Sequence, residues 1–195
     1  MDQTASLAFQ VAAGIGLAAC AGLRAFLPLF LVSATARLGW VTPGPPFEWL
    51  SSWAAVVVFG VAVVIEVLSD KIPLVDHALD LVQAVVKPAA GTVLAIAAFS
   101  DLSPQQKLVL GIIAGGGTAG VVHAVKAKVR LASSFATAGL GNPILSFGED
   151  VLSFVGTVLA LLVPFLLLLL VAATGLLLIF AAWRFRLRAE RLKER

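Results

Sequence analysis

Four carboxylates cluster on either side of a proline turn in the first half of the sequence. They form two pairs spaced four residues apart, Glu66 with Asp70 and Asp76 with Asp80. This spacing places both members of a pair on one helical face. Pro73 turns the chain between the pairs, so we expect the carboxylates to converge on one polar pocket, with Lys71 and His77 close by. Such a pocket could bind a divalent cation through oxygen ligands or share a proton. The alternative is a solvated interfacial loop with local salt bridges.

Basic residues follow a helical stripe in the second half. His123, Lys126 and Arg130 are spaced i, i+3 and i+7, which puts them on one face. A basic stripe of this kind suits an anionic head group, because arginine can bind phosphate through two parallel hydrogen bonds. The alternative is a helix end lying in the membrane interface.

Arg24 is the only charged residue in the apolar run 5–36. A charge at mid-membrane costs about 3 kcal/mol on insertion scales. We therefore expect Arg24 to face inward and to pair with a carboxylate or an anionic ligand. Glu149 and Asp150 open the last apolar run, and Asn142 precedes them. Acids there match a helix dipole, so capping alone could explain them, but we retain all three as candidate site residues.

The composition indicates a membrane protein. Of 195 residues, 60% are hydrophobic and 13% are charged, whereas soluble domains carry about 25% charged residues. The net charge of +3 is concentrated in the tail 184–195, where six Lys or Arg face two Glu. A basic segment directly after an apolar one places the C-terminus in the cytoplasm. One cysteine and two histidines exclude a disulfide scaffold and disfavour transition-metal or haem sites.

The hydropathy pattern predicts an all-α fold with four or five membrane crossings. We expect a helix over 5–36 bent near Pro28, a loop at 41–46 and a second helix over 49–65. Residues 75–87 are amphipathic, and Pro88 should break them from the apolar stretch 89–100, giving either a re-entrant hairpin or one broken crossing. A further helix over 108–125 and a loop over 131–147 follow. The uncharged run 151–183 should tilt, kink at Pro164 or split.

The two halves share a short repeat. Residues 34–39 read ATARLG and residues 136–141 read ATAGLG. We therefore divide the transmembrane domain 1–183 into repeat A (about 5–70), a central segment (71–106) and repeat B (about 107–183), followed by the tail 184–195. Each repeat begins with a stripe of small residues that favours close helix packing. Depending on whether the central segment crosses the membrane, the repeats are inverted or parallel.

Several motifs together resemble a known family. These are GLRAFLP at 22–28, the ExxxDKIPxxDxxxD pattern at 66–80, HxxKxxxR at 123–130, Asn142, and the acidic pair at 149–150. They resemble a family of bacterial integral-membrane proteins catalogued only as a domain of unknown function. The resemblance departs at Arg24, where the family would place a neutral polar residue. It implies a polytopic fold in a bacterial inner membrane and carries no activity.

Our leading hypothesis is a small membrane transporter or lipid/ion translocase with an intramembrane acidic–basic pocket. The expected partners are the bilayer, an anionic lipid or small ion, and further copies of the chain; nucleic acid is not expected. No cofactor is expected beyond a divalent cation held by Glu66, Asp70, Asp76 and Asp80. One alternative is a membrane-embedded, metal-dependent enzyme acting on phosphate-bearing lipid, and another is a non-catalytic scaffold.

Overall fold

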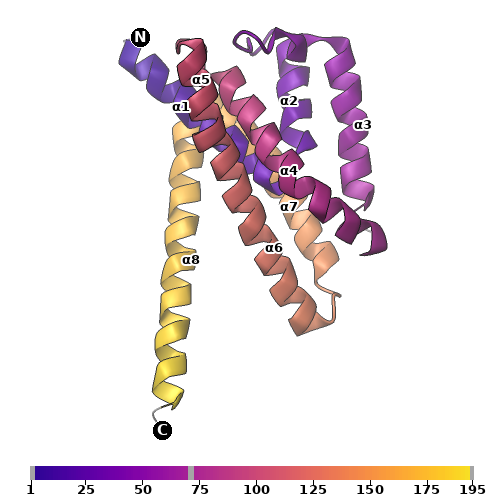
Figure 1. The fold of residues 1–195 in the computed structure, drawn as a ribbon, viewed down its shortest axis with the longest axis vertical. Coiled ribbons are helices and arrows are strands. Elements are labelled where there is room, and N and C mark those ends of the chain that lie inside the picture. Colours follow the sequence, from indigo (N-terminus) through magenta and orange to yellow (C-terminus); the bar gives the residue numbers. More distant parts are fainter. Residues whose placement is uncertain (1–2, 70–72, 194–195) are drawn as a thin grey trace.

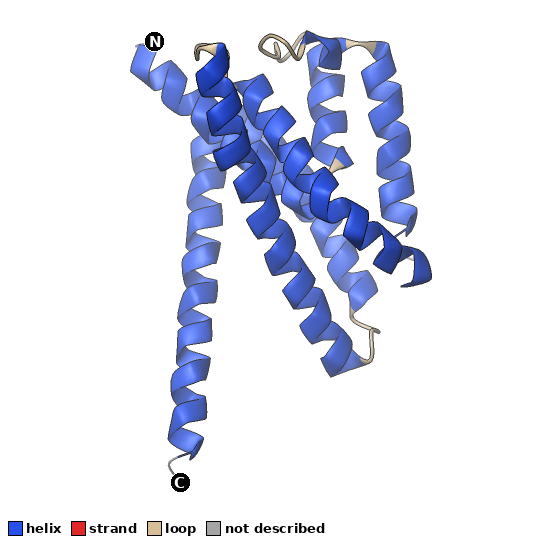
Figure 2. Cartoon of the chain, viewed as in Figure 1, coloured by secondary structure: helices blue, strands red, loops and turns tan. Residues whose placement is uncertain are grey.

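The computed structural model describes residues 3–69 and 73–193, and within these ranges the chain is helical with no strand (Figure 2). The elements are α1 (Gln3–Leu23), α2 (Phe26–Arg37), η1 (Glu48–Ser51), α3 (Trp53–Ser69), α4 (Pro73–Ala98), α5 (Pro104–Leu110), η2 (Gly111–Gly116), α6 (Gly117–Thr137), α7 (Asn142–Leu162) and α8 (Pro164–Lys193). The predicted all-α helix bundle is confirmed.

Helix α1 forms the centre of the bundle and packs against α4, α6, α7 and α8 (Figure 1). Its small residues let the other helices approach closely. A Cβ atom added at Gly22 would lie 2.6 Å from the Ala119 carbonyl oxygen on α6. At Gly115, in the π-helical turn η2, an added Cβ would lie 2.6 Å from Ala95 Cβ on α4. The predicted small-residue stripes therefore pack against other helices of the same chain.

The first apolar run is interrupted at Arg24–Ala25, four residues before the expected bend at Pro28. Proline has no N–H to donate to the Arg24 carbonyl, and its ring crowds that carbonyl, so Pro28 disfavours a regular helix through residue 24. Instead, Pro28 lies in the first turn of α2, where backbone N–H groups have no helical partner. Helix α2 then runs back toward the end of the bundle where the N-terminus lies (Figure 1).

Pro88 does not end a helix, so the prediction of a broken or re-entrant segment over 74–100 is wrong in this respect. Helix α4 continues through Pro88 from Pro73 to Ala98. The Thr92 hydroxyl donates to the Pro88 carbonyl oxygen at 2.9 Å. One turn later, an added Cβ at Gly91 would lie 2.6 Å from Ala119 Cβ. Tertiary packing against α1 and η2 outweighs the local cost of proline.

The loop expected over 131–147 is confined to 138–141. Helix α6 extends to Thr137, and its hydroxyl groups bond to carbonyls of the preceding turn, as Ser134 Oγ does to Arg130 O at 2.9 Å. The run 151–183 splits, as one of the predicted alternatives has it: α7 ends at Leu162 and α8 begins at Pro164. The repeated segments 34–39 and 136–141 end α2 and α6 at opposite ends of the bundle (Figure 1).

In the described part of the chain, three helical segments are long and apolar enough to cross a membrane: Ser6–Leu23, Pro104–Thr137 and Asn142–Leu162. Four shorter apolar helices accompany them, at Phe26–Arg37, Trp53–Ser69, Val82–Ala98 and Pro164–Leu177. The connection between α2 and α3 carries the exposed Trp40 and Trp49, and Trp53 is exposed where α3 begins. Exposed tryptophans mark a membrane–water interface. The chain is therefore a helical membrane protein.

Candidate functional site

The break between α1 and α2 lies in the interior of the bundle, where Arg24 and Ala25 are both fully buried. A break leaves backbone N–H groups without helical partners. Here the carboxylate of Glu66, on α3, accepts from them: Ala25 N donates to Oε1 at 2.9 Å and Phe26 N donates to Oε2 at 3.1 Å. Glu66 thus caps α2 from a different helix, and its negative charge faces the positive end of the α2 dipole.

Arg24 connects the same break to α7. Its Nη2 donates to Ser146 Oγ at 2.8 Å and to Ser146 O at 3.2 Å. Its Nε lies 2.6 Å from Asp150 Oδ1, and Nη2 lies 3.9 Å from Glu149 Oε2. The structure therefore places Arg24 inward and beside carboxylates, as its position in an apolar run predicts.

The basic stripe of α6 meets Glu149. Arg130 binds this carboxylate through two hydrogen bonds, Nε to Oε1 at 3.2 Å and Nη2 to Oε2 at 2.8 Å. Lys126 Nζ lies 2.9 Å from Glu149 Oε2 and also donates to the Leu23 carbonyl oxygen at 3.1 Å, just before the break. Both cations are buried, with 6% and 8% of their surface exposed. Glu149 is thus the shared counter-charge of α6, beyond the capping role that the sequence suggests.

Lys87 is a member of this group that the sequence analysis missed. It is fully buried on α4, and its Nζ lies 3.3 Å from Nδ1 of His123 on α6. It also interacts electrostatically with Lys126, Glu66 and Glu149. The signal in the sequence was weak, because Lys87 directly precedes Pro88 at the end of the amphipathic segment 75–87. Hereafter the charge centre means Arg24, Glu66, Lys87, His123, Lys126, Arg130, Glu149 and Asp150.

The other candidate residues lie away from the charge centre or outside the described part of the chain. Asn142 begins α7 and donates from Nδ2 to Ser134 Oγ at 2.9 Å, which ties the turn between α6 and α7. Asp70 and Lys71 fall outside the described residues. Asp76 and Asp80 lie on α4, and their side chains are not described. Of the four clustered carboxylates, only Glu66 can be placed. Within the described ranges, no three His, Cys, Asp or Glu side chains form a group that could hold a metal ion.

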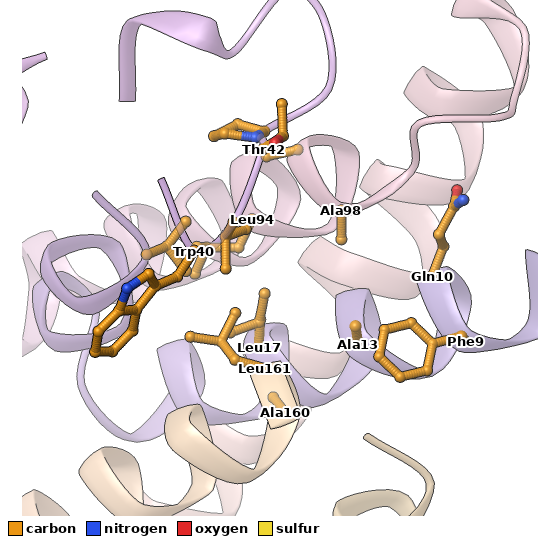
Figure 3. A pocket seen from close by; sticks show the side chains of 14 residues that line it. Phe9, Gln10, Ala13, Leu17, Trp40, Thr42, Leu94, Ala98, Ala160 and Leu161 are labelled. Carbon is orange, nitrogen blue, oxygen red and sulfur yellow. The ribbon is translucent and has the colours of Figure 1, made fainter. Parts of the chain in front are cut away.

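A cavity of about 240 Å³ lies between α1, α4, α7 and the loop after α2, away from the charge centre (Figure 3). Apolar side chains such as Leu17, Leu94 and Leu161 form its walls, and Trp40 lies at its edge. Gln10 also lines it, but this amide is engaged: Ser100 N donates to its Oε1 at 2.8 Å, and its Nε2 donates to Asp101 Oδ2 at 2.7 Å. The cavity contains none of the predicted site residues.

Together, the fold and the site define a class: a helical membrane protein whose interior charges surround a broken helix. Within this class the chain belongs to the DUF4126 family, described as a domain of unknown function, whose family model matches residues 11–185. This match covers every residue of the charge centre. No curated protein and no solved structure gave a match.

Proposed function

We propose that this protein is a small membrane transporter or lipid/ion translocase, and that its charge centre is the site where substrate or protons bind. The buried break at Arg24–Ala25 carries the proposal. In lipid, non-helical backbone is tolerated only where protein buries it or where it lines a cavity. Transporters often place their binding sites at such discontinuous helices, whose exposed backbone groups face the substrate.

The polar groups around this break come from several helices. Glu66 of α3 accepts from the backbone after the break, and Lys126 of α6 donates to the carbonyl before it. Ser153 of α7 donates to the Cys20 carbonyl oxygen at 3.1 Å. A movement of one helix relative to the others must therefore exchange these contacts. That coupling is what an alternating-access mechanism requires.

Lys87 and His123 supply a group that can exchange a proton. Among the described residues, no carboxylate lies within 4 Å of the Lys87 ammonium, so this lysine is not locked in a local ion pair. A lysine ammonium can donate to a neutral imidazole, whereas a second proton on the pair would place two like charges in contact. Proton binding here would change the electrostatic balance with Glu66 and Glu149.

The mechanism follows from competition for the cations. Glu149 and Asp150 pair with Arg24, Lys126 and Arg130 in this arrangement. An anionic substrate group would replace these internal partners, or protonation of a carboxylate would release them. Either event stabilises a second arrangement of the helices by differential binding. We place this protein in a bacterial cytoplasmic membrane, with the basic tail 184–195 on the cytoplasmic side, where positive segments are retained.

Charge displacement in response to a pH step tests the proposal without a known substrate. Full-length protein in liposomes, adsorbed on a solid-supported membrane, should give a transient current when the external pH changes. Lys87→Met and His123→Gln should reduce this current by about tenfold or more. Lys128→Met is the matched control, because Lys128 lies on the same helix as His123 but is exposed.

Two outcomes would contradict transport. If both variants fold normally and the currents equal those of the unaltered protein, or if no current appears at all, a structural scaffold remains. If the protein instead turns over a phosphate-bearing lipid in a Mg²⁺-dependent reaction, with no charge displacement, the enzyme alternative holds. Circular dichroism and size-exclusion profiles establish the folding of each variant.

A further inference from the structure

Helices α1 and α7 pack against each other in opposite directions, so their contacts occur at successive levels. Arg24 donates to Ser146 Oγ at 2.8 Å within the charge centre. One turn earlier on α1 and two turns later on α7, Ser153 Oγ donates to the Cys20 carbonyl oxygen at 3.1 Å. Further along, Ala160 of α7 lines the cavity of about 240 Å³ (Figure 3). The charge centre and this cavity therefore share one helix interface and are separated by the level of Cys20.

The face of α7 that meets α1 is polar. Ser146, Glu149, Ser153 and Thr157 are buried and spaced i, i+3, i+7 and i+11, which puts them on one helical face, whereas Val155 is exposed on the opposite one. The Ser153 and Thr157 hydroxyls donate to carbonyl oxygens and keep lone pairs that can accept a hydrogen bond. Polar residues buried within membrane helices often mark a substrate or ion pathway. This polar face extends from the charge centre to the turn before the cavity.

The interface is closed at the level of Cys20. A Cβ atom added at Gly156 of α7 would lie 2.7 Å from Cys20 Sγ, so the two helices touch there. Cys20 is 4% exposed and Thr157 is fully buried. The Cys20 carbonyl oxygen accepts from Arg24 N at 3.0 Å as well as from Ser153 Oγ. The closed contact is therefore bonded directly to the backbone of the broken helix.

We propose that this contact between Cys20 of α1 and Gly156 and Thr157 of α7 is the closed gate of the translocation path, and that the cavity beyond it is the vestibule. The proposal rests on the proposed function, because it assigns a gate to the same transporter. Alternating access requires a barrier between the binding site and each side of the membrane. This contact is a barrier on the path from the charge centre to the end of the bundle where the N-terminus lies (Figure 1).

The vestibule has the composition expected beyond a closed gate. Leu17, Leu94 and Leu161 form apolar walls, and an apolar constriction excludes ions by keeping water out. At its far end Gln10 donates to Oδ2 of the exposed Asp101 at 2.7 Å. The vestibule therefore leads from the gate toward water at the surface.

The gate and the charge centre are coupled through α7. This helix carries Glu149 and Asp150, which pair with the cations, and also Thr157 at the gate. A substrate that replaces these carboxylates, or a proton that neutralises one, removes contacts that hold α7 against α1 and α6. Separation of α7 from α1 then opens the gate, because the same interface closes it.

Thiol labelling of the full chain in liposomes tests the gate. Cys20 is the only cysteine in the sequence, so Cys20→Ser gives a background without thiols. In this background Thr157→Cys places a thiol at the gate, and Val155→Cys on the lipid-facing side of the same helix is the matched control. A membrane-impermeant cationic methanethiosulfonate should react at least about tenfold faster with Thr157→Cys, because only the thiolate reacts and a thiol in hydrocarbon does not ionise. Equal rates, or an inert Thr157→Cys, would overturn the proposal.

Labelling should also stop transport. A reagent attached to Thr157→Cys should abolish the pH-step current, whereas exposure of Val155→Cys to the same reagent should leave it unchanged. Ser153→Cys, which is nearly isosteric with the natural residue, repeats the test if Thr157→Cys does not fold. An unchanged current after complete labelling at either gate position would overturn the proposal.

The gate and the proposed function can fail separately. Inert thiols at both gate positions, together with normal pH-step currents, would remove the gate from this interface and leave the transporter. Rapid labelling at the gate positions in a protein that gives no pH-step current would show that the interface opens, and would contradict the proposed function.

Discussion

The chain interrupts its long apolar segments at two places, Arg24–Ala25 and Val163–Pro164, and the two breaks are built differently. At the second break, local backbone bonds meet the freed groups: Val163 N donates to Leu159 O at 2.7 Å, and Leu166 N donates to Val163 O at 3.0 Å. At the first break, three side chains far away in sequence bond to the backbone groups: Glu66 of α3, Lys126 of α6 and Ser153 of α7.

This difference in how the backbone groups are bonded distinguishes a simple connection between helices from a candidate functional site. Pro164 is buried at the first position of α8, where its missing N–H costs nothing, so proline geometry alone accounts for that turn. Pro28 likewise disfavours a continuous helix, but it does not explain why charged groups converge on the break. A helix is therefore interrupted at both places, but charged and polar side chains from several helices meet only at the first. That property marks the first break as the candidate site.

Removing the shared counter-charge should have the largest effect at the first break. Glu149→Gln leaves Lys126 and Arg130 buried beside a neutral amide. Loss of one partner from a buried ion pair costs about 3–5 kcal/mol, so we expect a strongly reduced unfolding temperature in detergent. Glu48→Gln is the matched control, because Glu48 is exposed. Equal melting of the two variants would show that the charge centre contributes nothing to the fold.

Removing the cap should loosen only the first break. In Glu66→Gln the neutral amide offers one acceptor oxygen where the carboxylate offers two, so α2 should lose about 1–3 kcal/mol of local stability. Hydrogen exchange should accelerate at the amides of Ala25 and Phe26, which donate to Glu66. The amides of Val163 and Leu166 serve as the internal reference, since they bond to local carbonyls. Faster exchange at both breaks would mean that Glu66 supports the whole bundle and does not act locally.

The sequence was a better guide to the second break than to the first. Pro164 within an uncharged run of 33 residues, 151–183, is enough to narrow the prediction to a tilt, a kink or a split, because proline acts through local geometry. The inward position of Arg24 also followed from the cost of a charge in lipid. Its partners did not, because Asp150 and Ser146 come together with it only through the packing of α1 on α7. Pro88 failed as a predictor for the same reason: long-range packing around Gly91 kept α4 continuous.

Replacing each proline should distinguish the two breaks, with a smaller change in the free energy of unfolding than the substitutions above. Pro164→Ala allows α7 and α8 to merge, so the distance between spin labels at Leu152 and Ile179, both exposed, should increase. Pro28→Ala should leave the first break in place, because Glu66 and Lys126 still satisfy its backbone groups. The stability change should be within about 1 kcal/mol for either variant, since a proline at a compatible position acts mainly on the unfolded chain. If spin labels on either side of residue 24 also moved apart in Pro28→Ala, the contacts of Glu66 and Lys126 would be a consequence of the break and would not stabilise it.

The smallest effect on stability is expected at an exposed polar contact. It serves as the comparison for the contribution of the buried charges. Asp101 lies in the connection between α4 and α5, outside the membrane-spanning helices. Hydrogen bonds from Gln10, and then from Ser6, lower the pKa of its carboxyl group. A carboxyl group with a lowered pKa in the folded state stabilises the fold above its unfolded value, about 3.9, and loses this contribution as the pH falls through the folded pKa.

Asp101→Asn should therefore lower the unfolding temperature slightly at neutral pH, and the difference from the unaltered protein should shrink as the pH falls from about 3.9 through the lower pKa of the folded state. Thermal unfolding in detergent over this pH range measures the effect, with Glu48→Gln again as the exposed control. Because Asp101 is accessible to water, its loss can be compensated by solvent, whereas water cannot replace Glu149 beside Lys126 and Arg130. A pH-dependent difference as large as that of Glu149→Gln would contradict this distinction, and the position of a charge relative to the broken helix would no longer explain its importance.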